Sequence, residues 1–190
     1  MSNQAPTQIP LWNLPDPVTS GSGIQSWTDN RGEVWVAKVG VRSGNWYRAR
    51  EVIKSAVYRS AAFNTSTAGS FFTYGWDVLR NDTYGIQTPN VYTFSAPVSG
   101  WYRFSAWFGV AANAANQWIQ AETVHSVSGN LSIDTDQVSV VGNMTIRTNL
   151  IWYMNASESV IYQYACSTAG LTGLTGVSTG AMWEYAGAGP

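Results

Sequence analysis

The stretch that decides the fold, residues 94–105, reads FSAPVSGWYRFS. A proline and a Ser-Gly pair supply turn chemistry in its middle. After the turn, the aromatic residues Tyr102 and Phe104 alternate with polar ones, which is the pattern of a strand with one buried face. The stretch therefore predicts two β-strands that are joined by a tight turn.

Further short strands are predicted on both sides of this stretch. Runs rich in aromatic and β-branched residues are separated by Gly, Asn or Asp clusters at intervals of roughly 8–12 residues. The predicted strands cover residues 57–61, 70–73, 76–79, 92–95, 101–108, 118–127, 138–141, 144–153, 160–165 and 181–185. The glycine-rich residues 170–180 are expected to form a flexible loop between the last two strands. The pattern predicts an all-β sandwich or barrel.

The composition agrees with a β-sheet protein and excludes several other classes. Of 190 residues only 11% are charged, against roughly 25% in an average soluble domain, and 10 are Trp and 10 are Tyr. Coiled coils and disordered chains have more charges and fewer aromatic residues. The net charge of −1 argues against a general nucleic-acid binder. The first residues lack a secretory signal and no apolar run can cross a bilayer, so we expect a protein made in the cytoplasm that needs no membrane.

The charges are unevenly distributed along the chain. Residues 31–59 carry seven basic and two acidic residues, a net charge of +5, whereas residues 61–190 carry a net charge of −4. Before them, residues 1–23 hold four prolines together with glycines, which predicts an extended arm. The chain is therefore expected to divide into the arm (1–23), a basic segment (24–55) and a head (56–190).

The basic segment is predicted to form a β-hairpin. Two runs that contain Trp35 and Trp46 alternate with period two, and residues 42–45 between them have turn composition. This arrangement places the two tryptophans near each other across the strands. A helix over residues 48–60 stays possible, because apolar residues there also recur at helical spacing.

The quoted stretch carries a resemblance to a known family. It contains, in order, an aromatic residue, a proline, a Ser-Gly pair and a Tyr-x-Phe motif. The polar residues 81–85 before it look like a loop of the family, and residues 160–164 and 181–187 look like the last two strands of the family's fold. In this order they resemble the trimeric jelly roll of tumour-necrosis factors and complement globular heads, over about residues 56–190. Trp101 departs from the pattern, which more usually has an aliphatic residue there.

This resemblance implies a jelly-roll β-sandwich that forms a homotrimer. The residues implied in the core and trimer motif are Phe94, Pro97, Gly100, Tyr102, Phe104, Tyr162, Tyr164 and Trp183. A different β-sandwich is the alternative, because turn residues and alternating aromatic residues suit any half-buried strand.

The basic segment resembles a second group of proteins. Residues 34–38 (VWVAK) and 44–47 (GNWY) are similar to hairpins of bacteriophage tail and virion proteins. An arm with apolar residues but no core of its own usually lies on another surface, so we expect it to anchor the head. The basic segment is expected to dock on an acidic protein surface. The expected anchoring residues are Leu11, Trp12, Leu14, Trp35, Lys38, Trp46, Arg48 and Arg50. A plain two-stranded ribbon packed on the head is the alternative.

No arrangement of residues predicts an enzyme. His125 is the single histidine, and its place in an alternating run favours a strand surface or an interface over a catalytic triad. Cys166, the single cysteine, follows apolar residues and is expected in the core. Asp134 and Asp136 offer oxygen ligands to calcium, but two carboxylates are too few and a solvated loop is favoured. We therefore predict no catalytic residue, no metal and no cofactor.

Two functions fit these expectations. The first is a structural protein on the surface of a virion, a homotrimer that its N-terminal arm anchors to the major capsid protein and that decorates and stabilises the shell. The second is a module associated with phage tail proteins that recognises a host receptor or glycan through exposed aromatic side chains. A hydrolase is not favoured, and neither function needs nucleic acid as a partner.

Overall fold

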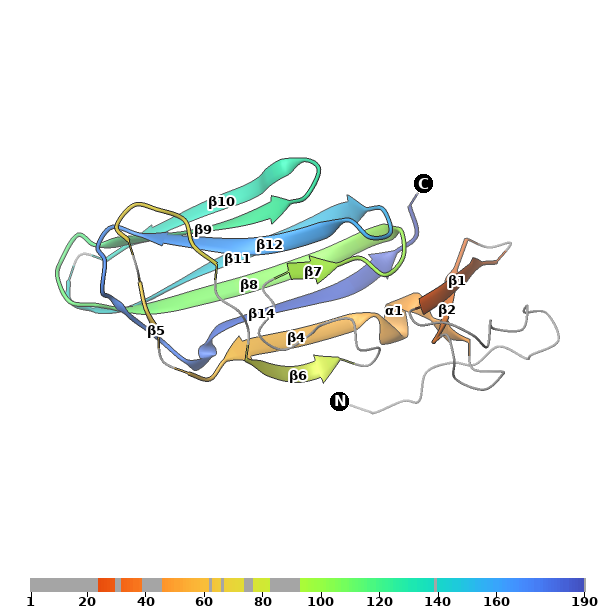
Figure 1. Ribbon diagram of the computed structural model, residues 1–190, viewed down its shortest axis with the longest axis horizontal. Coiled ribbons are helices and arrows are strands. Elements are labelled where there is room, and N and C mark those ends of the chain that lie inside the picture. Colours follow the sequence, from red (N-terminus) through yellow and green to blue (C-terminus); the bar gives the residue numbers. More distant parts are fainter. Residues whose placement is uncertain are drawn as a thin grey trace.

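The computed structural model describes residues 24–29, 32–38, 46–61, 63–65, 67–73, 77–82, 93–138 and 140–189. Two sheets lie face to face in an elongated sandwich, and a small three-stranded sheet lies at one end (Figure 1). The elements in chain order are β1 (Ile24–Thr28), β2 (Val34–Lys38), β3 (Tyr47–Arg48), α1 (Ala49–Val52), β4 (Lys54–Arg59), β5 (Phe63–Asn64), β6 (Val78–Asp82), β7 (Thr93–Ser95), β8 (Gly100–Ala112), β9 (Trp118–His125), β10 (Gly129–Gln137), β11 (Gly142–Met154), β12 (Ser159–Cys166), β13 (Thr172–Gly173) and β14 (Gly176–Gly187).

The larger sheet is built around β8. Its order is β5-β13-β8-β14-β4-β6. β13 and β14 pair with successive parts of one edge of β8, and β11 pairs with its other edge. β11 pairs with β8 along its whole length, from Gly142 opposite Ala112 to Met154 opposite Gly100. The smaller sheet has the order β10-β9-β12-β7, and the strands of both sheets pair antiparallel. This architecture is the predicted jelly-roll β-sandwich.

Aromatic side chains fill the space between the two sheets. Tyr102 and Phe108 on β8 are fully buried, as the alternation in the sequence predicts. Phe94 on β7 packs against Trp183 on β14 with ring centroids 4.9 Å apart, and Phe108 stacks on Tyr164 of β12 at 4.1 Å. Aromatic pairs contribute roughly 0.5–1.5 kcal/mol beyond the area that they bury, so these contacts help to fix how the two sheets face each other.

The tight turn predicted before β8 is present, and it requires a glycine. Gly100 has a φ of +155°, and a Cβ there would lie 2.4 Å from Cε2 of Tyr185 and 2.6 Å from the carbonyl oxygen of Gly187. The hydroxyl of Tyr102 donates to the carbonyl oxygen of Val98 at 2.8 Å. The Ser-Gly pair of the sequence therefore reflects the close approach of β14 to the start of β8.

The small sheet of β1, β2 and β3 is joined to the sandwich by core contacts. One of its faces carries Val34 and Val36, which belong to the same hydrophobic core as Ile53 and the buried residues of α1. The backbone N–H of Tyr185 on β14 donates to the carbonyl oxygen of Ile53 at 2.9 Å. The core therefore runs across the predicted boundary between basic segment and head, and that division stays a prediction; the arm, residues 1–23, lies outside the described residues.

Strand β10 is the main difference from the sequence-based expectation. The sequence predicts a strand over residues 138–141, whereas residues 138, 140 and 141 are not in a strand and β10 ends at Gln137. β10 is an edge strand with mostly exposed side chains, so neither of its faces needs to be apolar. Its polar sequence, GNLSIDTDQ, therefore gives no alternation to recognise.

The glycine-rich residues 170–180 are not a loop, because they contain β13 and the start of β14. At Gly173 on β13 a Cβ would lie 2.0 Å from Cζ of Phe63, so this glycine serves close packing and not flexibility. Residues 70–73, predicted as a strand, form one isolated bridge between Phe72 and Tyr164.

The helix considered over residues 48–60 is reduced to the single turn of α1, because β4 begins at Lys54. No helix in the described part of the chain is long and apolar enough to cross a membrane.

Gly180 on β14 provides a test of this packing. A Cβ at this position would lie 2.7 Å from Cζ2 of Trp107 and 2.8 Å from the carbonyl oxygen of Val57. We predict that Gly180→Ala lowers the free energy of unfolding by about 1–3 kcal/mol, because the neighbouring groups must move. Gly142→Ala is the matched control, since no atom lies within 4 Å of its Cβ position. Urea denaturation measures both variants, and equal stability would contradict the packing.

Candidate functional site

The large sheet presents one face to solvent, and this face carries large apolar side chains. Trp101 is 39% exposed, Ile151 is 52% exposed and Met182 is 44% exposed. Trp101 meets Tyr153 edge to face, with ring centroids 5.7 Å apart. The name "sheet face" is used below for the outward residues of β4, β8, β11 and β14, which include Lys54, Trp101, Arg103, Ser105, Trp107, Arg147, Asn149, Ile151, Tyr153, Met182 and Glu184. Exposed sheet faces are ordinarily polar, so this surface is a candidate for contact with another molecule.

Polar contacts lie between the apolar side chains of the sheet face. Arg103 on β8 forms an ion pair with Glu184 on β14. Ser105 donates its hydroxyl hydrogen to Oδ1 of Asn149 on β11 at 2.6 Å. These contacts run across the strands, so these four polar side chains have partners within the chain.

Further exposed apolar side chains lie on strand β10 and beyond its two ends. Val127 lies in the β9–β10 turn, Ile133 lies on β10, and Val140 and Val141 lie in the link to β11. These side chains are 71%, 54%, 68% and 64% exposed, respectively. They are spread along the strand and lie outside the sheet face.

Asp134 and Asp136, which the sequence places on a solvated loop, lie on strand β10. They stand opposite Ala121 and Ile119 of β9, and no other strand of the described residues pairs with β10. Charged side chains on an edge strand discourage pairing with the edge of another sheet. No group of three or more His, Cys, Asp or Glu residues suited to hold a metal ion occurs within the described ranges.

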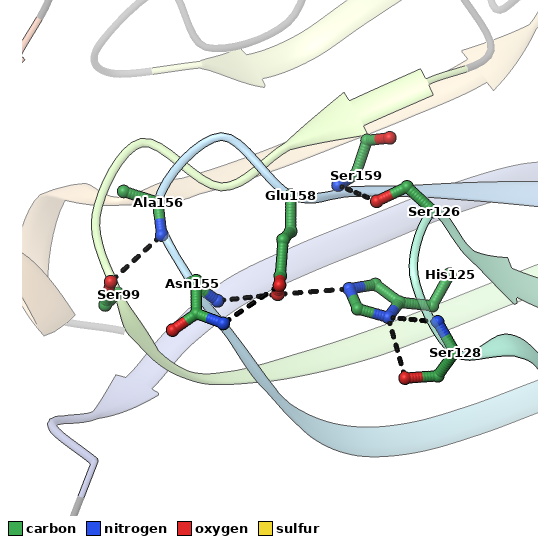
Figure 2. A network of polar contacts seen from close by, with 8 residues as sticks. All are labelled: Ser99, His125, Ser126, Ser128, Asn155, Ala156, Glu158 and Ser159. Atoms are coloured by element: carbon green, nitrogen blue, oxygen red, sulfur yellow. Dashed lines mark hydrogen bonds and ion pairs between the residues drawn. The ribbon is translucent and has the colours of Figure 1, made fainter.

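A polar network ties together three turns at one end of the sandwich, and we call it the clasp (Figure 2). The backbone N–H of Ser159 donates to Oγ of Ser126 at 3.0 Å, and the backbone N–H of Ala156 donates to Oγ of Ser99 at 2.9 Å. The members of the clasp are Ser99, His125, Ser126, Ser128, Asn155, Ala156, Glu158 and Ser159. The β7–β8, β9–β10 and β11–β12 turns are therefore held to one another by side chains.

His125 is 3% exposed at the centre of the clasp, so the prediction of a strand surface or an interface is wrong for the single chain. The backbone N–H of Ser128 donates to Nδ1 of His125 at 3.2 Å, which makes Nδ1 an acceptor and places the ring hydrogen on Nε2. Nε2 lies 3.2 Å from Oε2 of Glu158, a close polar contact that falls short of an aligned hydrogen bond. The ring therefore caps the β9–β10 turn.

Ser128, His125 and Glu158 stand in the order of a Ser-His-acid triad, with Oγ of Ser128 3.2 Å from Nδ1 of the ring. The backbone N–H of Ser128 already occupies the nitrogen that would have to accept the hydroxyl proton. The geometry fits a turn cap better than a general base.

The predicted anchoring residues fall into three groups. Trp35 and Trp46 lie near each other, as predicted, but they are 3% and 1% exposed and form a small core with Ala37 and Trp27. This burial comes from within the small sheet, where the indole N–H of Trp35 donates to Oδ2 of Asp29 at 3.1 Å. Both tryptophans therefore stabilise the small sheet itself.

Two basic members of the anchoring set, Arg48 and Arg50, have acidic neighbours. Arg48 lies over the ring of Trp35, 5.5 Å from its centroid, and Nη1 of Arg48 lies 3.8 Å from Oε1 of Glu51. Nη2 of Arg50 lies 3.1 Å from Oε2 of Glu33. Lys38 ends β2, and the remaining members, Leu11, Trp12 and Leu14, lie outside the described residues.

The residues of the predicted core and trimer motif lie in the core of the single chain, and their role in a trimer stays a prediction. Its aromatic members Phe94, Tyr102, Phe104, Tyr162, Tyr164 and Trp183 are all buried, and Pro97 is half-buried. Burial raises the pKa of Tyr162 and of Tyr164 well above the ordinary value. Burial also raises the pKa of Cys166 to about 12, so this thiol behaves as a core side chain and not as a nucleophile.

Comparison with known proteins identifies the fold. No family model and no curated protein sequence matches the chain. Solved structures do match. The globular domain of a zebrafish complement 1qA protein has a TM-score of 0.50 and 11% identity, over 69% of this chain and 93% of that one. The Eiger TNF of S. frugiperda has a TM-score of 0.50 and 8% identity, over 73% and 94%. Murine APRIL has a TM-score of 0.51 and 8% identity, over 70% and 99%.

The chain therefore has the jelly roll of tumour-necrosis factors and complement globular heads, which is the fold that the motif in residues 94–105 implies. At these identities the likeness concerns the fold alone.

The clasp makes a testable contribution to stability in acid. Hydrogen bonds from the side chain and backbone of Asn155, together with the nearby His125, lower the pKa of Glu158. The carboxylate therefore stabilises the fold above the unfolded-state pKa of about 4.3, and this contribution is lost as the pH falls through the lower folded-state pKa.

We predict that Glu158→Gln is less stable than the wild type at pH 7 and that this difference shrinks as the pH falls below about 4. Urea unfolding midpoints measured across this range check the prediction, with Glu51→Gln on α1 as the control. If the stability difference between the wild type and Glu158→Gln is the same at every pH, Glu158 does not act through its charge.

Proposed function

We propose that the protein is a non-enzymatic structural protein that assembles into a homotrimer through the sheet face. The observation that carries this proposal is the exposure of Trp101, Ile151 and Met182 on one sheet surface. Covering apolar surface contributes roughly 25 cal/mol per Å² that is removed from water. A second copy of the chain suits this role, because each copy also carries exposed apolar side chains outside the sheet face, such as Ile133 on β10.

Strand β10 supports a ring of copies in particular. Ile133 shares one face of β10 with Thr135 and Gln137, whereas Asp134 and Asp136 alternate to the other face. The Ile133 face of β10 therefore offers apolar and uncharged side chains to the sheet face of another copy. Contact between two unlike surfaces closes into a ring when the rotation permits. The motif resembles trimeric heads, so three copies are expected.

Within this proposal, the trimer decorates the capsid of a phage. Support comes from the likeness of residues 34–38 and 44–47 to phage hairpins and from the small sheet, whose core contacts fix it to the head. Because Trp35 and Trp46 are used inside the small sheet, the arm residues Leu11, Trp12 and Leu14 are the apolar side chains proposed to reach the capsid protein.

Charged substitutions on the sheet face test the trimer. We predict that Ile151→Asp combined with Met182→Asp raises the concentration of half-dissociation at least about tenfold, since the face would lose two apolar side chains and two added carboxylates per chain would have to lose water. Thr28→Asp, on an exposed position of the small sheet, is the control. Sedimentation equilibrium measures all three proteins, and an assembly that tolerates the double variant would contradict the use of this face.

Removal of residues 1–23 tests the anchoring role. We predict that the truncated protein still forms trimers in solution but is absent from purified particles, because the arm supplies the contact with the capsid. Quantitative mass spectrometry of particles gives the occupancy. Unchanged occupancy would contradict the anchoring role, and a full-length protein found on the tail alone would favour the receptor-binding or glycan-binding alternative.

A further inference from the structure

One row of side chains crosses the sheet face from β11 to β4. The strand register places Ile151, Arg103, Glu184 and Lys54 side by side on β11, β8, β14 and β4. Arg103 forms an ion pair with Glu184. Glu184 is the one acidic residue at the outward positions of these four described strands, and it has a basic neighbour on each side.

This row has different consequences in the free chain and in an assembly. In the free chain the side chains of Arg103 and Glu184 are 57% and 39% exposed, and a solvated ion pair of this kind adds little to stability. When another molecule covers the row, water is excluded from both groups. The free-energy cost of burying a guanidinium without a partner is then much larger than that of burying it together with its carboxylate partner.

We propose that Glu184 is the charge-balancing residue of the interface between copies, which neutralises Arg103 so that the sheet face can be covered. This inference rests on the proposed function. Without the carboxylate, the covered row would hold Arg103 and Lys54 as two uncompensated positive charges. Salt weakens such repulsion, because the screening length falls from about 10 Å at 0.1 M to about 3 Å at 1 M ionic strength. The signature is a salt-dependent loss of assembly by a chain that folds normally.

Three variants of the full chain separate this role from others. Glu184→Gln keeps the size of the side chain and removes its charge. Glu51→Gln is the matched control, because it removes the same charge from α1, where Glu51 lies beside Arg48 and outside the sheet face. Arg103→Met combined with Glu184→Met removes both charges of the pair. Sedimentation equilibrium at about 0.1 M and about 1 M salt gives the concentration of half-dissociation of each protein.

We expect Glu184→Gln to raise that concentration about tenfold at 0.1 M salt and much less at 1 M salt. Glu51→Gln and the double Met variant should assemble as the wild type does at both salt concentrations. Urea unfolding of the dilute, dissociated chains should give equal midpoints for Glu184→Gln and the wild type, which separates the effect from a folding defect.

The outcomes distinguish this inference from the proposed function. If the wild type does not assemble at any concentration, the proposed function fails and the role of Glu184 fails with it. If the wild type assembles while Glu184→Gln and Glu51→Gln have the same half-dissociation concentration at both salt concentrations, only the role of Glu184 is overturned.

Discussion

The pairing of β8 with β11 on one edge and with β14 on the other is the constraint on which the rest of the structure depends. β8 has 13 residues and begins at Gly100, where the approach of Tyr185 leaves no room for a side chain. Because both edges of the strand are occupied, its backbone groups are paired within the sheet and its side chains must alternate between two faces.

This alternation connects stability to function. The inward residues of β8, such as Tyr102 and Phe104, fill the space between the sheets and are fully buried. The outward residues of the same strand begin with Trp101 and Arg103, which remain exposed on the sheet face. A single strand therefore supplies both the core that stabilises one chain and the surface proposed to bind another.

Residues 94–105 predicted two strands joined by a turn, because turn residues and alternating aromatic residues are local signals. The jelly roll was predicted from the family resemblance that these residues carry together with residues 160–164 and 181–187. The closeness of Trp35 and Trp46 was also predicted, since pairing of neighbouring strands brings them into one cluster. Strand β10 was missed because an exposed edge needs no apolar alternation, and Gly173 was read as flexible although it serves close packing. The ion pair of Arg103 with Glu184 depends on the register between strands far apart in the chain, which no local pattern contains.

Copies of the chain are proposed to cover the sheet face, and the oxidation of Met182 tests this contact. Met182 is 44% exposed in one chain, whereas Met144 and Met154 are buried and serve as internal controls. Brief peroxide treatment followed by mass spectrometry gives the rate of sulfoxide formation at each methionine. We expect Met182 to be protected from oxidation at high protein concentration and to become reactive on dilution. A rate of oxidation at Met182 that is high and independent of protein concentration would contradict it.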